Sequence, residues 1–376
     1  MPLRTTPRAR LTLFTPGPVE IPTIVNDYLI DPPCNYHRQD GFKDMFAANQ
    51  RDVKALLGLE RPGDVDVTFL LASGTGTNEA CLRALAALGK GVIIENGFFG
   101  QRLAEQARRG DIDHLVYRAP HDVPLDVARL DEFLATQRDL RWAYVVTHET
   151  RATLRNPLVG IGQTCKRHGL RVGADCVSSA FAYPLELEAA GVDLAVATTS
   201  KALMSVPGLG IVLARKDMMD ELRAAAKGDT YYLDLVGEHD KQEKELAPRF
   251  GQPVQLHAAV RGACLHLRSI GIDAHMHRIR VQLEDITRHL EGLGVTAMLA
   301  PEHRGWVAGN FLLPPGMLYP ELTRLMADEG FYILYGAIED PRQFQVCTMG
   351  DLSAADVDGL KTAFTRVLGR DVRAVA

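Results

Sequence analysis

The sequence has no hydrophobic run that approaches the length of a membrane-spanning helix, which argues against an integral membrane protein. It also has no basic excess, because 42 Lys and Arg stand against 47 Asp and Glu for a net charge of −5. No face for nucleic acid or anionic membrane is therefore expected. The basic N-terminus is followed by an apolar stretch that Pro16, Gly17 and Pro18 interrupt, so it does not read as a secretion signal. We expect a cytoplasmic protein whose partners are small molecules and a second copy of itself.

Metal-ligand spacing is also missing from the sequence. The six cysteines lie far apart and include no C-x-x-C pair, and the twelve histidines include no H-E-x-x-H motif. The cysteines therefore predict reduced, mostly buried thiols, and we predict no metal site.

Short apolar runs do alternate with helical patterns between about residues 65 and 215. Strands that are apolar on both faces and separated by helices predict an α/β fold with a mostly parallel sheet covered on both sides. The charged stretch 216–250 is predicted to be a connecting region, and the patterns after it favour a smaller α+β domain. We place an N-terminal segment at 1–22, a large domain at 23–255 and a small domain at 256–376.

Two polar residues stand where apolar strands end. Lys201 follows the strand A-V-A-T-T, and Asp175 ends the strand R-V-G-A-D. The ends of parallel strands meet at one edge of a sheet, so this amine and this carboxylate are expected to converge. Taken alone, Asp175 also fits a turn and Lys201 a solvated surface. Together they are what pyridoxal 5'-phosphate needs, an imine-forming amine and an acid that keeps the pyridine nitrogen protonated.

Other segments at the same edge suit the rest of such a cofactor. The turn L-A-S-G-T-G-T-N offers free backbone N–H groups, a helix dipole and the hydroxyls of Thr75 and Thr77 to an anion. An ordinary N-capped turn would look the same. In N-G-F-F-G-Q-R, Phe99 is the better candidate to stack on a flat heterocycle, although both phenylalanines also fit a core. The next strand ends in T-H-E-T-R, which adds more polar residues to this edge.

In order and spacing these motifs resemble the class V pyridoxal-phosphate aminotransferases of the aspartate aminotransferase fold. The likeness runs over almost the whole chain, through F-T-P-G-P-V, S-G-T-G, N-G-F-F-G, D-C-V-S-S, S-K-A-L and F-Q-V-C-T-M-G. Within the family the chain looks like the 2-aminoethylphosphonate:pyruvate and alanine:glyoxylate aminotransferases. The resemblance implies fold type I, with a mostly parallel seven-stranded sheet in the large domain, and a homodimer with the site at the subunit interface.

The resemblance also implies a role for each matching residue. Lys201 would bind the cofactor and later move the α-proton of the substrate, Asp175 would pair with the pyridinium, and Phe99 would stack on the ring. The further cofactor contacts that it implies are Ser73, Gly74, Thr75, Gly76, Thr77, Thr150, Ser178 and Ser200, with Gln255 from the neighbouring subunit. The implied substrate contacts are Pro16, Gly17, Arg151 and Gln345.

Three departures from the family pattern bear on the substrate. The family usually has an arginine that binds the carboxylate or phosphonate of the substrate, and Gln345 stands in its place. Arg151 replaces a small hydroxylated residue, and R-F-G-Q-P-V-Q replaces a hydroxyl-rich segment of the neighbouring subunit. One hypothesis is that the anion-binding arginine has moved to Arg151. The alternative is that Arg151 faces solvent and the substrate lacks that anion.

The leading interpretation is an aminotransferase for a small anionic amine such as 2-aminoethylphosphonate, with a 2-oxo acid as acceptor. The alternative is an ammonia-lyase or other elimination enzyme that uses the same cofactor on a β-substituted, for example hydroxylated, aminophosphonate. Such an enzyme needs no 2-oxo acid, so it would lose less from Gln345. A nucleotide-binding oxidoreductase is disfavoured because S-G-T-G lacks the third glycine of the dinucleotide fingerprint.

Overall fold

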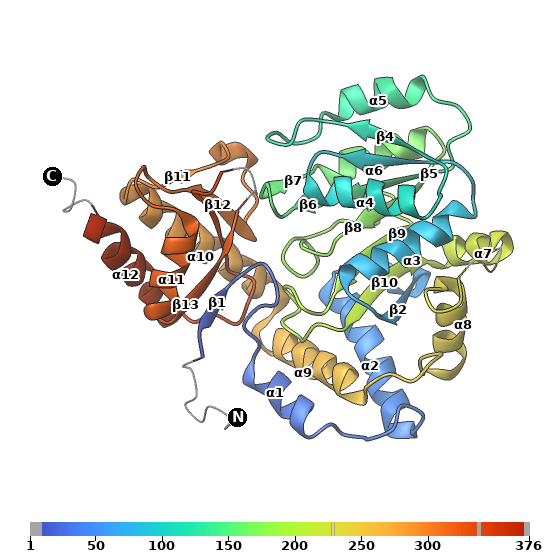
Figure 1. Ribbon diagram of the computed structural model, residues 1–376. Helices are drawn as coiled ribbons and strands as arrows, with labels where there is room; N and C mark the ends of the chain where they lie inside the picture. Colours follow the sequence, from blue (N-terminus) through green and yellow to red (C-terminus); the bar gives the residue numbers. More distant parts are fainter. Residues whose placement is uncertain (1–9, 227, 229, 337–339, 372–376) are drawn as a thin grey trace, which may run out of the picture.

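The computed structural model describes residues 10–226, 228, 230–336 and 340–371. The first nine residues of the predicted N-terminal segment lie outside the described residues. Two sheets organise the chain, a large one built from residues 65–215 and a small one that belongs mostly to the C-terminal third (Figure 1).

The large sheet has seven strands in the order β2-β10-β9-β8-β5-β3-β4. All neighbouring pairs are parallel except those of β10, which runs antiparallel to β2 and β9. The sheet confirms the predicted α/β class and strand number. Its strands are β2 (Val65–Leu71), β3 (Gly91–Glu95), β4 (His114–Arg118), β5 (Trp142–Val146), β8 (Arg171–Asp175), β9 (Leu194–Thr198) and β10 (Leu209–Arg215).

Helices cover both faces of this sheet, which explains why its central strands are apolar throughout. One face carries α3 (Gly74–Ala86), α4 (Phe98–Arg109), α7 (Lys216–Ala225) and α8 (Leu235–Glu245). The other carries α2 (Asp40–Leu56), α5 (Val127–Ala135), α6 (Leu158–Arg167) and α9 (Val254–Ile270), with α1 (Thr23–Ile30) packed on α9.

The charged stretch 216–250 is not a connector, so that prediction was wrong. It folds as α7 and α8, and Met218, Leu222 and Leu235 bury their side chains in the same core as α3. The charges of α7 lie on the solvent face of an amphipathic helix, whereas α8 also buries the polar side chains of Glu238 and His239.

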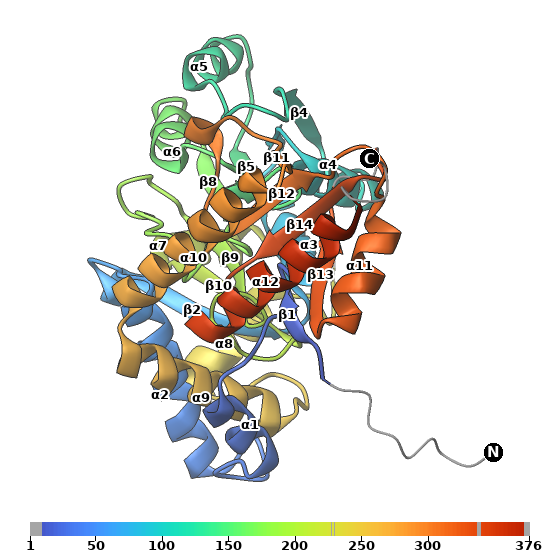
Figure 2. The ribbon, with the colours of Figure 1, turned by 90° about the vertical axis from the view of Figure 1, so that its left-hand side faces the viewer.

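The small sheet has the order β1-β13-β14-β12-β11. Its first strand comes from the other end of the chain, because β1 (Thr12–Phe14) pairs in parallel with β13 (Phe331–Tyr335), as Figure 2 shows. The other strands are β11 (Thr296–Ala297), β12 (Ala308–Leu312) and β14 (Gln343–Cys347). The helices of this unit are α10 (Ile272–Gly292), α11 (Tyr319–Asp328) and α12 (Ala354–Asp371).

Each unit has its own core. Phe14, Phe311, Phe344 and Phe364 pack in the small unit, whereas the buried residues of α9 belong to the core of the large unit. On α2 the buried Asp52 accepts hydrogen bonds from Arg261 and Arg268 of α9, which ties these helices together. The domain boundary predicted between residues 255 and 256 stays a prediction.

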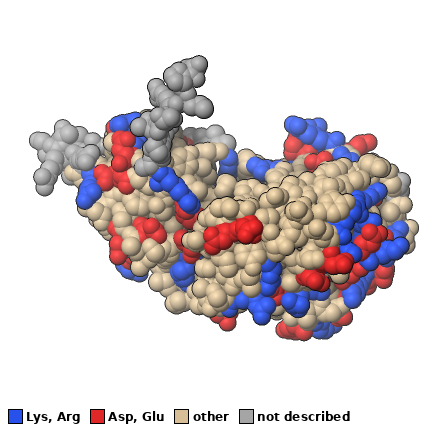
Figure 3. Space-filling view, turned by 90° about the horizontal axis from the view of Figure 1, so that it is seen from below, with Lys and Arg blue, Asp and Glu red and all other residues tan. Residues whose placement is uncertain are grey.

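The surface carries no large field of one sign on the face seen in Figure 3, where basic and acidic residues are interspersed. In the described part of the chain, no helix combines the length and the hydropathy that a membrane span requires. All six cysteines are free, and five of them are buried. The predicted cytoplasmic location stays a prediction.

Candidate active site

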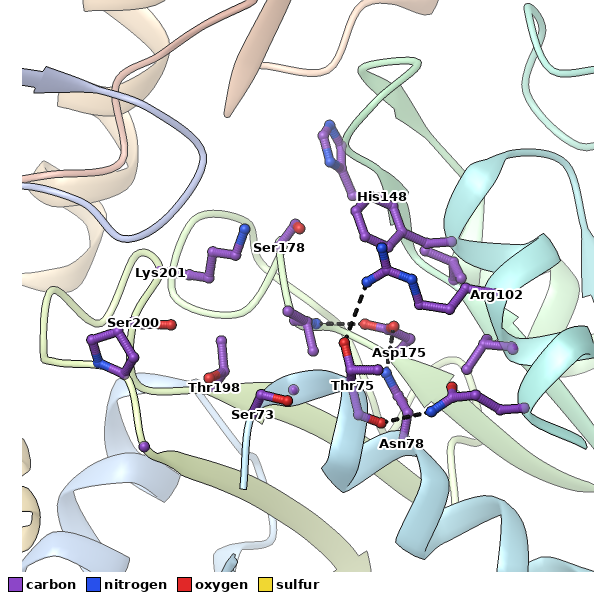
Figure 4. Close-up of a pocket in the computed structure, with 18 residues that line it drawn as sticks. Ser73, Thr75, Asn78, Arg102, His148, Asp175, Ser178, Thr198, Ser200 and Lys201 are labelled. Carbon is purple, nitrogen blue, oxygen red and sulfur yellow. Dashed lines mark hydrogen bonds between the residues drawn. The ribbon is translucent and has the colours of Figure 1, made fainter. Parts of the chain in front are cut away.

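A pocket opens where the large-sheet strands end and α3 and α4 begin. Figure 4 shows Lys201 on one side of it, and Asp175 and Arg102 on the other. The segments that line it follow the ends of five strands (β2, β3, β5, β8 and β9), which the sheet brings together at one edge. The predicted site residues that line it are Ser73, Gly74, Thr75, Phe99, Asp175, Ser178, Ser200 and Lys201.

Lys201 lies just after β9, with its aliphatic stem against the N-terminal loop. Its Nζ donates a hydrogen bond to the carbonyl of Pro16. Gly17 has a φ of +137°, and a Cβ there would lie 2.9 Å from Cδ of the lysine, so this loop needs a glycine to approach so closely. Burial lowers the pKa of the Lys201 ammonium, which favours the neutral, nucleophilic amine. The predicted substrate contacts Pro16 and Gly17 therefore lie beside the amine.

Asp175 ends β8 and is 7% exposed. One carboxylate oxygen accepts a hydrogen bond of 2.7 Å from Nδ2 of Asn78, and the other accepts one of 2.8 Å from the Val177 amide. Asn78 is itself oriented by the hydroxyl of Tyr144 at 2.8 Å. Burial raises the pKa of Asp175, and its two hydrogen-bond donors are neutral. A cationic N–H placed in the pocket would compensate for the buried charge.

The N-terminus of α3 forms another wall of the pocket. Ser73 caps the helix by accepting a hydrogen bond from the Gly76 amide at 3.2 Å. The hydroxyl of the exposed Thr75 accepts a hydrogen bond of 3.3 Å from Arg102, which lies on α4. A helix N-terminus beside a guanidinium group attracts anions. The sequence reasoning missed Arg102, although its position three residues after Phe99 puts both on one helix face.

Phe99 lines the pocket from the first turn of α4, with Phe98 packed edge-on at 5.4 Å between ring centroids. Glu149 fixes this turn, because its carboxylate accepts hydrogen bonds from the amides of Phe99 at 2.9 Å and Gly100 at 2.7 Å. Burial raises the pKa of Glu149 to about 7, and the two amide donors only partly oppose this effect.

The raised pKa of Glu149 predicts a pH dependence of stability. Between about pH 4.5 and 7 the folded protein keeps a proton on Glu149 that the unfolded chain has released, so this group stabilises the fold less as pH rises. We expect the difference in unfolding free energy between wild type and Glu149→Gln to fall by roughly 2 to 3 kcal/mol over this window and then level off. Urea unfolding from about pH 5 to 8 measures it, and a difference independent of pH would contradict this assignment.

Eight predicted site residues are not among those that line the pocket, and four of them use their polar groups within the protein. Thr77 is fully buried under Gly210 of β10 and donates its hydroxyl to the Ser73 carbonyl at 3.0 Å. The amide of Gly76 donates a hydrogen bond to the hydroxyl of Ser73, and the buried Thr150 donates its hydroxyl to Ser178. These hydrogen bonds hold the walls of the pocket. The predicted direct contacts of Gly76, Thr77 and Thr150 with a cofactor stay predictions.

Gln345 is the fourth, and it is 2% exposed on β14. Its Nε2 donates to the Thr150 carbonyl at 2.6 Å and to Oδ1 of Asn310 at 2.8 Å. It thus ties the small sheet to the loop after Glu149 and does not line the pocket. Gln255, in contrast, is exposed on the first turn of α9, and its role at a neighbouring subunit stays a prediction.

His148 lines the pocket at its upper edge and is a residue that sequence reasoning only grouped with its neighbours. Its ring packs against Tyr183 at 5.6 Å, and neither ring nitrogen has a hydrogen-bond partner among the described residues. Burial lowers the pKa of His148 to about 3, so the ring is neutral at physiological pH. It serves here as a flat, uncharged wall.

The geometry can now be compared with known proteins. The family model described as aminotransferase class-V matches residues 49–311. The chain belongs to the class V aminotransferases. Membership makes the protein an enzyme of the transaminase class and implies pyridoxal phosphate as its cofactor.

Relatives named 2-aminoethylphosphonate–pyruvate transaminase match this chain over nearly its whole length. The one from Phocaeicola vulgatus is 26% identical over 94% of this chain and 98% of its own, and the one from Salmonella typhimurium is 26% identical over 93% and 96%. The alanine–glyoxylate aminotransferase of Nostoc sp. has the same fold, with a TM-score of 0.89 at 24% identity over 98% of both chains. The large unit therefore has the fold type I architecture that the sequence predicted.

The pocket fits the cofactor that the family implies. The buried Asp175 carboxylate has only neutral donors, so it suits the protonated nitrogen of a pyridine ring. The α3 N-terminus, Thr75 and Arg102 suit a phosphate, and Phe99 lines the same pocket from α4.

Proposed function

We propose that this protein is a pyridoxal-phosphate-dependent aminotransferase that moves the amino group of a small anionic amine to a 2-oxo acid. The observation that carries the proposal is one pocket that joins the Lys201 amine, the buried Asp175 carboxylate and the anion-attracting start of α3. The names of the Phocaeicola and Salmonella relatives support a donor similar to 2-aminoethylphosphonate.

Six residues of this chain, besides Lys201, would hold the cofactor. Asp175 would keep the ring nitrogen protonated, Phe99 would cover one face of the ring, and Ser73, Thr75 and Ser200 with Arg102 would bind the phosphate. When bound, pyridoxal phosphate supplies an electron sink for the carbon that carries the amino group.

Lys201 would act as the general acid and base that transfers the proton. Burial lowers the pKa of its ammonium, so the amine can accept a proton from the substrate carbon at neutral pH and return it to the product. The loop of Pro16 and Gly17 covers the amine and limits the access of water. When the amine is free of the cofactor, the Pro16 carbonyl accepts its hydrogen bond.

We propose a homodimer as the working assembly. An aromatic cluster supports it, because Tyr231 and Tyr232 are 77% and 49% exposed and both pack on Phe250 at 5.6 Å. Large exposed aromatic side chains are typical of protein interfaces. The cluster adjoins the segment 249–255 that is expected to reach a neighbouring site.

A single-turnover experiment tests the proposed reaction against elimination, for which the comparisons give no support. Loaded protein is mixed with 2-aminoethylphosphonate and no 2-oxo acid, and the absorbance of the cofactor and free ammonia are followed. A transaminase loses its visible band once, releases no ammonia, and regains the band when pyruvate is added. Repeated ammonia release with an unchanged band would overturn the proposal in favour of elimination.

A further inference from the structure

Gln345 has no hydrogen-bond donor left for a ligand. Its amide nitrogen carries two protons, and both are used by the Thr150 carbonyl and by Asn310. What remains free is the carbonyl oxygen, an acceptor that disfavours an anion. The position where the family usually binds the acidic group of its substrate therefore has no such capacity in this chain.

Arg151 is a cation held beside the pocket. Its guanidinium carbon lies 3.7 Å from the ring centroid of Phe98 and 5.4 Å from that of Tyr335, and one nitrogen donates to the Tyr335 hydroxyl at 3.3 Å. Two aromatic faces restrict the planar group to one orientation. With one donor used by Tyr335, the guanidinium has further N–H groups for a ligand.

The backbone of Arg151 is fixed from the small unit. Asn310 on β12 donates to the Arg151 carbonyl, and Gln345 on β14 donates to the carbonyl of Thr150 just before it. The two amides also bond to each other. The small sheet thus grips the loop that carries the guanidinium, so Gln345 is a positioning residue for Arg151.

Arg151 and Arg102 form a cationic pair around one ring. Both guanidinium groups lie on Phe98, at 3.7 and 5.0 Å, and Arg102 also lies 4.9 Å from Phe99. In the described ranges neither arginine forms an ion pair with a carboxylate. Arg102 donates to Thr75 in the pocket, whereas Arg151 donates to Tyr335. Arg151, which has no ion-pair partner among the described residues, favours an anion at this wall.

We propose that Arg151 binds the acidic group of the substrate, a phosphonate or a carboxylate, in place of the missing small-domain arginine. The proposal rests on the proposed function, since it names the part of the amine that this wall recognises. Phe98 and Tyr335 orient the guanidinium for a bidentate contact. Asn310 and Gln345 fix the position of the loop that carries it. Specificity for the acidic group then comes from the loop after Glu149, not from β14.

Calorimetry with unreactive anions tests this site without any turnover. Methylphosphonate and acetate are titrated into the cofactor-loaded protein, into Arg151→Gln and into Arg155→Gln. Arg155 is the matched control, because it also lies over two aromatic rings, Tyr183 at 4.8 Å and Trp306 at 5.2 Å, four residues farther along. The loss of a bidentate charged contact should weaken binding by about 10- to 100-fold in Arg151→Gln only.

The arms of the experiment separate the possible ligands. Weaker binding of methylphosphonate alone assigns the site to phosphonates, and weaker binding of acetate alone assigns it to carboxylates. Equal binding of both anions to wild type and Arg151→Gln, an equal loss in Arg155→Gln, or no binding to wild type would overturn the proposal. Failure of the proposed function looks different, because it removes the single conversion of the visible band in the wild type.

A measurement of KM tests the same proposal during turnover. In Arg151→Gln the KM for 2-aminoethylphosphonate should rise by about 10-fold or more, whereas the visible band of the loaded protein should be unchanged. Gln345→Leu removes both amide donors from the loop and should raise the same KM, though by less than Arg151→Gln. A KM unchanged in both variants would contradict the role of the loop.

Discussion

Replacing Lys201 by alanine is expected to lower kcat by about four orders of magnitude, because the residue provides both the covalent attachment and the proton transfer. The pocket should survive, since the only polar contact of the Lys201 side chain in the described structure is with the Pro16 carbonyl. The variant should also lose the visible absorbance that pyridoxal phosphate gives when bound to a lysine.

Steady-state turnover and an absorbance spectrum measure both effects. Lys244→Ala is the control, because Lys244 is exposed on α8 and does not line the pocket. Turnover by Lys201→Ala within about tenfold of wild type would contradict the assignment of this lysine.

The second large effect is expected for Asp175→Asn, which keeps the size of the side chain and removes its charge. A neutral amide cannot hold a protonated ring nitrogen, so kcat should fall by about 10²- to 10³-fold. Asp175→Glu keeps the charge but moves it away from Asn78 and Val177, and it should recover only part of the activity.

Asp193→Asn is the matched control for Asp175. Asp193 is also deeply buried, at 2% exposure, but it forms ion pairs with Lys166 and Arg171. It lies where β8 and β9 begin, at the edge of the sheet opposite the pocket. Its replacement should lower the unfolding temperature and leave kcat of the remaining folded protein near wild type. If Asp175→Asn changed only the unfolding temperature, Asp175 would be a structural residue.

The large sheet was predictable because its strands are buried on both faces and therefore appear as unbroken apolar runs between helices. The small sheet was harder. Its first strand, β1, has three residues and pairs with β13 more than 300 positions later, and no local pattern encodes such a pairing. The sequence did not predict α7 and α8, because the apolar stripe of α7 is short and lies in a charged segment, and α8 buries mainly polar side chains.

The site was predictable where a charged residue follows an apolar strand, because such a residue is rarely placed there for packing alone. Lys201 and Asp175 line one pocket, as expected from parallel strands that end at the same edge. Thr75 and Thr77 could not be told apart until the start of α3 was known. Residues two apart on a helix point to nearly opposite sides, so Thr75 lines the pocket and Thr77 lies under β10. Asn78 and Arg102 were missed because each acts through a partner, Asp175 or Thr75, that only the fold brings near.

The departures from the family pattern acquire a physical meaning in the structure. Gln345 was read as a lost anion contact, and the fold gives it a second task, because its two donors support the loop of Arg151. Arg151 does not extend freely into solvent, since Phe98 and Tyr335 hold it. The elimination alternative loses part of its motivation, because a cation for the substrate is still present beside the pocket.

The most direct measurement is chemical labelling of the cofactor attachment site. Wild-type protein is loaded with pyridoxal phosphate, reduced with borohydride, digested and analysed by mass spectrometry. We predict one stable pyridoxyl label, on the peptide that contains Lys201, and its loss in Lys201→Ala. A label on another lysine, or none on a protein that still transaminates, would contradict the central role of Lys201 in this pocket.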